Sequence, residues 1–266
     1  MKQPTTGQIR EWIDDAHYDI ESQKRRLKEG FREKHNLTLE GFFRARGNYY
    51  LDIAIGHAML GDRQQAKEAL TESIQYLSLP YRMAYDETCE HRDQAAPAEK
   101  NGAIGIPQTN SLLLAMAALD NDKINEAMIP FVQLAERYEQ DQEFMEMVQT
   151  IRALRVMLSR GEDNLSASIL KTALDHSESH PIKGAGWRRR TYTINLTLWS
   201  VLQRQQETFD QALKLFLKDY ETEARGENRD LPIAYASLEA VGLIKLARRY
   251  GLTYEDSHPL IPPALL

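Results

Sequence analysis

The sequence predicts an all-α protein, built as an irregular, tetratricopeptide-like array of helical hairpins with an extended C-terminal cap. Glycine (14) and proline (10) are sparse among 266 residues, and strong helix formers are common. No segment shows the sustained polar and apolar alternation of a strand. A turn followed five residues later by alanine also recurs, and a small residue there permits close pairing of helices. A non-repetitive helical domain remains the alternative.

A stacked array counts as one unit, so residues 1–266 are expected to form a single helical domain. Residues 1–38 would supply an N-terminal helix and linker, and residues 39–266 the stacked hairpins and tail. The N-terminal helix is expected from about Thr6 to Glu29, because apolar residues recur there at helical spacing. Its apolar face carries Ile9, Trp12, Ile13, Ala16, Ile20 and Leu27, and its opposite face carries Glu11, Asp14, Asp15, Asp19 and Glu21.

Four segments are expected to fold as helical hairpins. The first pairs residues 42–60 with residues 62–77, because Gly61 can end one helix and Asp62 can cap the next. The other three are residues 111–138, 150–177 and 192–220, in which Ala127, Ala167 and Ala212 follow the turns. An insertion at residues 82–107 separates the first hairpin from the rest.

The last helix is expected within residues 231–250, bounded by Pro232 and Gly251. The tail beyond it ends in an apolar stretch, Leu260 to Leu266, whose prolines prevent a helix. We expect this stretch to lie extended over the face of the terminal helix that no further repeat covers. A disordered tail is the alternative, although disordered tails are seldom this apolar.

Composition excludes several classes of function. The net charge of -6 argues against general nucleic-acid affinity, and no apolar stretch is long enough to span a membrane, so neither partner is expected. A single cysteine, Cys89, excludes an intramolecular disulfide and suits a reducing compartment. The N-terminal region is rich in both signs of charge and resembles no export signal. These observations together predict a cytoplasmic protein.

No catalytic, metal or cofactor site is expected. His176 and His180 are four residues apart, as in some zinc sites, but they lie at a helix end without an evident third ligand. The segment from Asp120 to Phe131 opens like a calcium loop and then departs from that pattern. Cys89 and His91 are too close in sequence to define a nucleophile and its base.

The segment GAGWRRR, residues 184–190, is the nearest match to a phosphate-binding turn. Gly184, Gly186 and the three arginines that follow could seat a phosphate before a helix. Its spacing matches no nucleotide loop, so an ordinary, solvated basic run at a helix start is the preferred interpretation.

Acidic clusters are the features most suggestive of a binding surface. Charged faces of repeat proteins often only confer solubility, but such clusters also match a basic protein partner. We treat Trp187 as a candidate aromatic anchor, with burial in the core as its alternative. The candidate partner-binding residues are Asp14, Asp15, Asp19, Glu136, Glu139, Asp141, Glu143, Glu146 and Trp187.

The second half of the chain, from about Asn110 to Leu266, resembles the bacterial immunity protein 49 family of polymorphic toxin systems. The resemblance rests on the order of its helical segments and on the tail pattern, and it departs from the family at His258-Pro259-Leu260. The first 40 residues match no family. The residues that carry the tail pattern are Pro232, Gly251, Asp256-Ser257, Ile261-Pro262 and Leu265-Leu266.

That resemblance implies a non-enzymatic cytoplasmic protein that binds and neutralises a cognate toxin domain. It transfers no catalytic residues, because family members inhibit by binding. The helical immunity proteins of secreted nucleases are a related alternative. A tetratricopeptide-like adaptor or peptide-sensing regulator is the second interpretation. A hydrolytic enzyme is disfavoured, because the sequence lacks a convergent set of acid, base, nucleophile or metal ligands.

Overall fold

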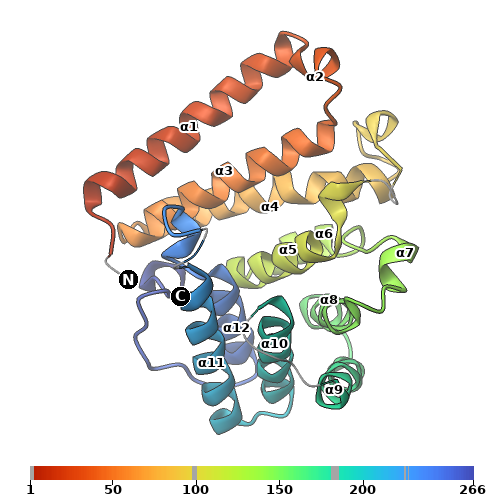
Figure 1. Cartoon of the computed structure of the whole chain (residues 1–266), viewed down its shortest axis with the longest axis vertical. Coiled ribbons are helices and arrows are strands. Elements are labelled where there is room, and N and C mark those ends of the chain that lie inside the picture. The colour runs from red at the N-terminus through yellow and green to blue at the C-terminus, as the bar shows by residue number, and fades with distance from the viewer. Residues whose placement is uncertain (1–2, 98–100, 181–185, 225, 227) are drawn as a thin grey trace.

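The computed structural model describes residues 3–97, 101–180, 186–224, 226 and 228–266, and these residues form helices, turns and loops without a strand (Figure 1). The predicted all-α class is therefore confirmed. In Figure 1 the N-terminal helices lie at the top, α5 lies in the middle, and α8 to α12 lie below it. Across the same residues, no helix is both long and apolar enough to cross a membrane.

Helix α1 (Thr6–Lys28) follows the predicted bounds closely. Thr5 caps it, accepting a hydrogen bond from the Gln8 backbone N–H while the Gln8 side chain accepts one from the Thr5 N–H. Its apolar face, including Ile9 and Ile13, is buried against α3, and a short helix, α2 (Phe31–Lys34), follows. The acidic face of α1 consequently points away from the core.

Helices α3 (Leu39–Met59) and α4 (Arg63–Tyr85) form the predicted first hairpin. Gly61 adopts a φ of +81°, and Asp62 accepts a hydrogen bond from the Gln65 N–H at 3.1 Å, so the turn chemistry expected from the sequence is confirmed. The helices lie so close that a Cβ on Gly47 would come within 2.5 Å of the Leu77 side chain. The insertion after α4 holds the short 3-10 turns η1 (Arg92–Gln94) and η3 (Gly102–Ile104).

The prediction of a hairpin at residues 111–138 is wrong for its second helix. Helix α5 (Ile106–Leu119) is followed by α6 (Asp122–Met128), which has only seven residues. Pro130 has no N–H to donate and its ring obstructs the preceding turn, so α6 cannot extend into a full arm. Ala127 is exposed on α6 and makes no close helix pair. Another short helix, α7 (Glu136–Glu139), precedes the next hairpin.

The remaining two hairpins are confirmed. One pairs α8 (Met145–Leu158) with α9 (Asp163–Ser179), and the other pairs α10 (Trp187–Leu202) with α11 (Gln206–Ala224). The alanine of the last hairpin, Ala212, is buried as predicted, whereas Ala167 is only half-buried. The turn-plus-alanine pattern therefore identified the turns more reliably than it identified the packing.

Helix α12 (Leu238–Arg249) differs from its prediction in both its start and its neighbours. Pro232–Ala234 form a 3-10 turn, η4, and the helix begins only after Ser237, whose side chain accepts a hydrogen bond from the Ala240 N–H. The helix packs across α5 in the middle of the fold, and also contacts α10. It is buried between these helices, so it does not leave the uncovered terminal face that the array predicted.

The tail is buried, but it lies in a different place from the one predicted. Leu260, Ile261 and Leu265 are all at most 5% exposed. The Ser237 N–H donates to the Leu260 carbonyl at 2.8 Å, and the final turn η5 (Pro263–Leu265) packs on α3 and α4. The tail therefore fills the junction between α12 and the first hairpin, and it is not a lid over the end of an array.

Replacing Gly242 by alanine tests the contact between α5 and α12. An added Cβ would lie 2.5 Å from the Leu114 carbonyl oxygen, which belongs to backbone and cannot turn aside. We expect Gly242→Ala to lower the free energy of unfolding by about 1 to 3 kcal/mol in denaturant titrations, although alanine favours helix. Gly7→Ala is the control, since its Cβ would make only a 3.8 Å contact. Equal stability of the two variants would contradict the close crossing.

Replacing Leu260 by alanine tests the burial of the tail. Because Leu260 is 2% exposed, the substitution should lower the free energy of unfolding by about 2 to 5 kcal/mol. Leu165, which is 51% exposed on α9, offers a matched control, and Leu165→Ala should cost about 0.5 kcal/mol or less. An unchanged thermal midpoint for Leu260→Ala would mean that the tail does not stabilise the fold.

Candidate functional site

The first set of predicted binding residues lies on the outer surface of α1. Asp14, Asp15 and Asp19 are all exposed, and within the described part of the chain none of them forms a salt bridge. Tyr18, between them in sequence, is 68% exposed, the largest exposed fraction among the large apolar and aromatic side chains of the described residues. This outer surface, which we call the α1 acidic face, combines unpaired carboxylates with an accessible aromatic ring.

The second set lies around α7 and the start of α8. Glu136, Glu139 and Glu143 are exposed, and Glu139 forms a salt bridge with Arg152 at 3.3 Å. Asp141 has a local structural role, because its Oδ1 atom accepts hydrogen bonds from the backbone N–H groups of Glu143 at 2.9 Å and of Phe144 at 3.3 Å. These acids are therefore partly committed to interactions within the chain.

Trp187 lies at the surface beside this second set. It is 37% exposed and its ring stacks on Phe144, with 4.7 Å between ring centroids. Of the two interpretations that the sequence left open, burial in the core is wrong. The two rings form a small aromatic surface adjacent to Glu143 in the chain.

The two acidic sets do not form one surface. Helix α1 packs on α3, whereas α7 packs on α8, and Figure 1 shows α1 and α7 on separate edges of the molecule. A single compact partner domain would therefore engage one set or the other more readily than both.

Glu146 requires a correction, because it lies in the interior. Its side chain is 3% exposed, and its Oε1 atom contacts Arg188 at 2.9 Å and His176 at 3.1 Å. Burial alone would raise the pKa of Glu146, but the hydrogen bonds from Arg188, from the local backbone and from His176 outweigh it and lower the pKa. Glu146 therefore joins α8 to α9 and α10, and it does not belong to the acidic surface proposed from the sequence.

The arginine run at the start of α10 also differs from the solvated surface that the sequence predicted. Besides the Arg188 pair, Arg189 pairs with the buried Asp219 at 2.8 Å. Arg190 pairs with Glu223 at 2.7 Å and with Glu239 at 2.5 Å. The three arginines thus tie α10 to α8, α11 and α12. Gly184 of the candidate phosphate turn lies outside the described residues, and the arginines of that turn are engaged with carboxylates.

The paired histidines do not assemble a metal site among the described residues. The rings of His176 and His180 stack with 4.3 Å between centroids, and His176 is turned toward Glu146. Within the described ranges, no group of three or more histidine, cysteine, aspartate or glutamate side chains could hold a metal ion. The expectation that the protein binds no metal stays a prediction.

A cleft that the sequence did not indicate lies between α3, α5 and the loop before α12. Its volume is about 470 Å³, within the range of ligand sites, and its lining mixes apolar and polar side chains. Asp52 on α3 is half-buried in it, and burial raises the pKa of Asp52 to about 6. Arg44, Asn48, Gln108 and Ser111 supply further polar groups. A lone aspartate inside a helix that packs against both α1 and α4 gives no sequence signal of such a cleft.

Comparisons with protein-family models, with curated proteins and with solved structures find no match to this chain. The resemblance to the bacterial immunity protein 49 family therefore stays a prediction that rests on the residues named above.

The raised pKa of Asp52 predicts a specific dependence of stability on pH. An acid whose pKa is higher in the folded protein than in the unfolded chain destabilises the fold as the pH rises from about 4 to about 6. We expect Asp52→Asn to increase the free energy of unfolding at pH 8 by roughly 1 to 3 kcal/mol and to have little effect at pH 4. Denaturant titrations at both pH values would measure the free energies of unfolding. An equal effect of Asp52→Asn at the two pH values would contradict a raised pKa of Asp52.

Proposed function

We propose that this chain is an immunity protein, which binds a cognate toxin domain in the cytoplasm and neutralises it without catalysing a reaction. The observation that carries the proposal is the α1 acidic face, where Asp14, Asp15 and Asp19 are exposed and form no salt bridge with any of the described residues. Like charges on one helix surface repel one another, and a basic partner would relieve that repulsion. The predicted family supplies the class of partner.

Tyr18 is a second feature of the α1 acidic face that suits a protein interface. Exposed aromatic side chains are common anchors in interfaces, because they bury much area at little entropic cost. Tyr18 is 68% exposed amid the acids of α1, so a partner with a basic rim and an apolar pocket would fit this surface. Trp187 and Phe144 with Glu143 offer a smaller surface of the same kind near α7.

The second candidate function is a tetratricopeptide-like adaptor or a peptide-sensing regulator. The cleft around Asp52 favours it, because a partly buried carboxylate in a cleft lined by both apolar and polar side chains suits a peptide with one basic residue. This candidate needs no neighbouring toxin gene. It also predicts binding that depends on Asp52, and not on the acids of α1.

Charge reversal on α1 tests the proposed interface. Immunity requires nanomolar or tighter binding, at least about -12 kcal/mol, and complementary charge raises association rates by about 10 to 1,000-fold. The triple variant Asp14→Lys, Asp15→Lys and Asp19→Lys should therefore slow association with the adjacently encoded toxin domain at least about tenfold at low salt. The deficit should shrink at high salt, where charges are screened. Stopped-flow or surface-based kinetics would measure both rates.

The matched control reverses three exposed acids elsewhere, Glu87, Glu126 and Glu178, and so produces the same change in net charge. It should associate nearly as fast as the unmodified protein. Coexpression of the chain with the toxin domain then tests the function itself. If cells die despite soluble expression and no complex forms, the immunity proposal is contradicted and the adaptor takes its place. If cells survive while charge reversal on α1 leaves association unchanged, the function stands and the surface is wrong.

A further inference from the structure

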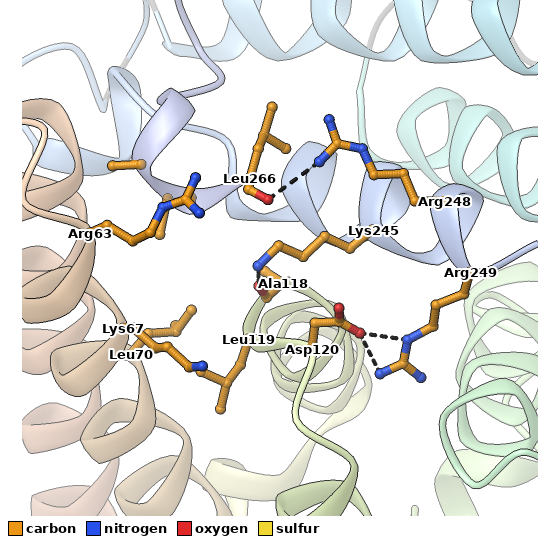
Figure 2. Close-up of a pocket in the computed structure, with 12 residues that line it drawn as sticks. Arg63, Lys67, Leu70, Ala118, Leu119, Asp120, Lys245, Arg248, Arg249 and Leu266 are labelled. Carbon is orange, nitrogen blue, oxygen red and sulfur yellow. Dashed lines mark hydrogen bonds and ion pairs between the residues drawn. The ribbon is translucent and has the colours of Figure 1, made fainter. Parts of the chain in front are cut away.

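A basic pocket lies where the start of α4, the end of α5, the last turns of α12 and the tail meet. Its volume is about 440 Å³. Arg63 and Lys67 of α4 line one side, and Lys245, Arg248 and Arg249 of α12 line the other, as Figure 2 shows. Asp120 is the single carboxylate side chain in the lining, so cations exceed acids there in a chain whose net charge is -6.

The contacts within the pocket leave most of this positive charge unbalanced. Arg249 pairs with Asp120, and the two groups largely neutralise each other. Lys245 donates to the Ala118 carbonyl oxygen at 2.7 Å, at the end of α5, while Arg63 and Arg248 donate to tail main-chain oxygens of Pro263 and Leu266, each at 3.3 Å. The Ala118 and Pro263 carbonyl oxygens satisfy single N–H groups but carry no full charge.

Lys67 is exposed, and no described group forms an ion pair or hydrogen bond with its ammonium. The other cations of the pocket repel the ammonium group of Lys245. Burial lowers the pKa of its ammonium group, and Lys67, Arg63 and Arg248 lower it further, against the opposing effect of Asp120. Like charges that converge in a concave site at such a cost are typical of binding sites for an oppositely charged group.

We propose that this pocket binds a small organic phosphate. Guanidinium groups match the oxygens of a phosphate, and Arg63, Lys67 and Lys245, which have no carboxylate side chain of the pocket as a partner, favour a dianion over a carboxylate. The apolar part of the lining would hold the organic portion of the ligand, and the volume suits a molecule larger than an inorganic ion. The apolar lining consists of Leu70, Ala118, Leu119, Ala264 and Leu265, with the aliphatic part of Leu266 at its edge.

The test uses phenyl phosphate as the probe for the full chain in isothermal titration calorimetry. Saturable one-to-one binding is expected, with a dissociation constant at least tenfold lower than those of inorganic phosphate, which lacks the apolar part, and of benzoate, which lacks the second charge. Absence of saturable binding would overturn the proposal. Equal affinity for benzoate would also overturn it, since the pocket would then be a general carboxylate site.

Two variants establish where the probe binds. Arg63→Ala with Lys67→Ala should weaken phenyl phosphate binding at least tenfold, and Lys67→Gln alone should weaken it several-fold. Lys67→Gln is informative because its ammonium has no hydrogen bond or ion pair with a described residue, whereas Arg63 holds the tail through Pro263, so the loss would not come from a broken tail contact. The control, Lys214→Ala with Lys218→Ala, removes two exposed lysines of α11 and should bind like the unmodified protein. Equal binding by all variants would place the probe elsewhere and overturn the proposal.

Discussion

The close crossing of α5 and α12 is the constraint on which the rest of the structure depends. Gly242 brings the α12 backbone against the Leu114 carbonyl and Ala117 of α5, at a distance that no larger residue permits. Since α12 is held there, the tail that follows must return beside α3 and α4. The basic pocket and the placement of Glu239 opposite Arg190 follow from the same crossing.

Features encoded by neighbouring residues were predictable from the sequence. The caps at Thr5 and Asp62 are short-range hydrogen bonds, and the apolar spacing of α1 reports burial of one face. Helix α1 therefore has nearly its predicted bounds, and α4 begins where it was predicted to begin, although it continues to Tyr85 and so passes its predicted end at residue 77. The position of α12 was not predictable in this way. A helix that is apolar on most of its surface must be buried, but its sequence does not say by which neighbours. The second arm of the hairpin at residues 111–138 was predicted wrongly because the recurrent turn pattern was given more weight than Pro130, which prevents α6 from extending.

For charged residues too, the sequence does not say which neighbours their side chains will have in the fold. A run such as Arg188 to Arg190 is solvated or paired according to what the neighbouring helices present, and here they present Glu146, Asp219, Glu223 and Glu239. Asp14, Asp15 and Asp19 lie opposite a strong apolar stripe, so their exposure was predictable from periodicity alone. The burial of Glu146 was not predictable from the sequence, because its partners His176 and Arg188 are 30 and 42 residues away in the chain.

Helix ends explain some of the positive charge in the basic pocket but not all of it. Arg248 and Arg249 lie in the last turn of α12, where the helix dipole favours cations, so they have a local reason to be there. Arg63 lies in the first turn of α4, where the dipole favours acids, and that turn contains no acidic residue. A cation placed against the local field, and facing other cations across a cavity, requires a compensating interaction from outside its own helix. An anion within the pocket would supply that compensation to Arg63, Lys67 and Lys245 together.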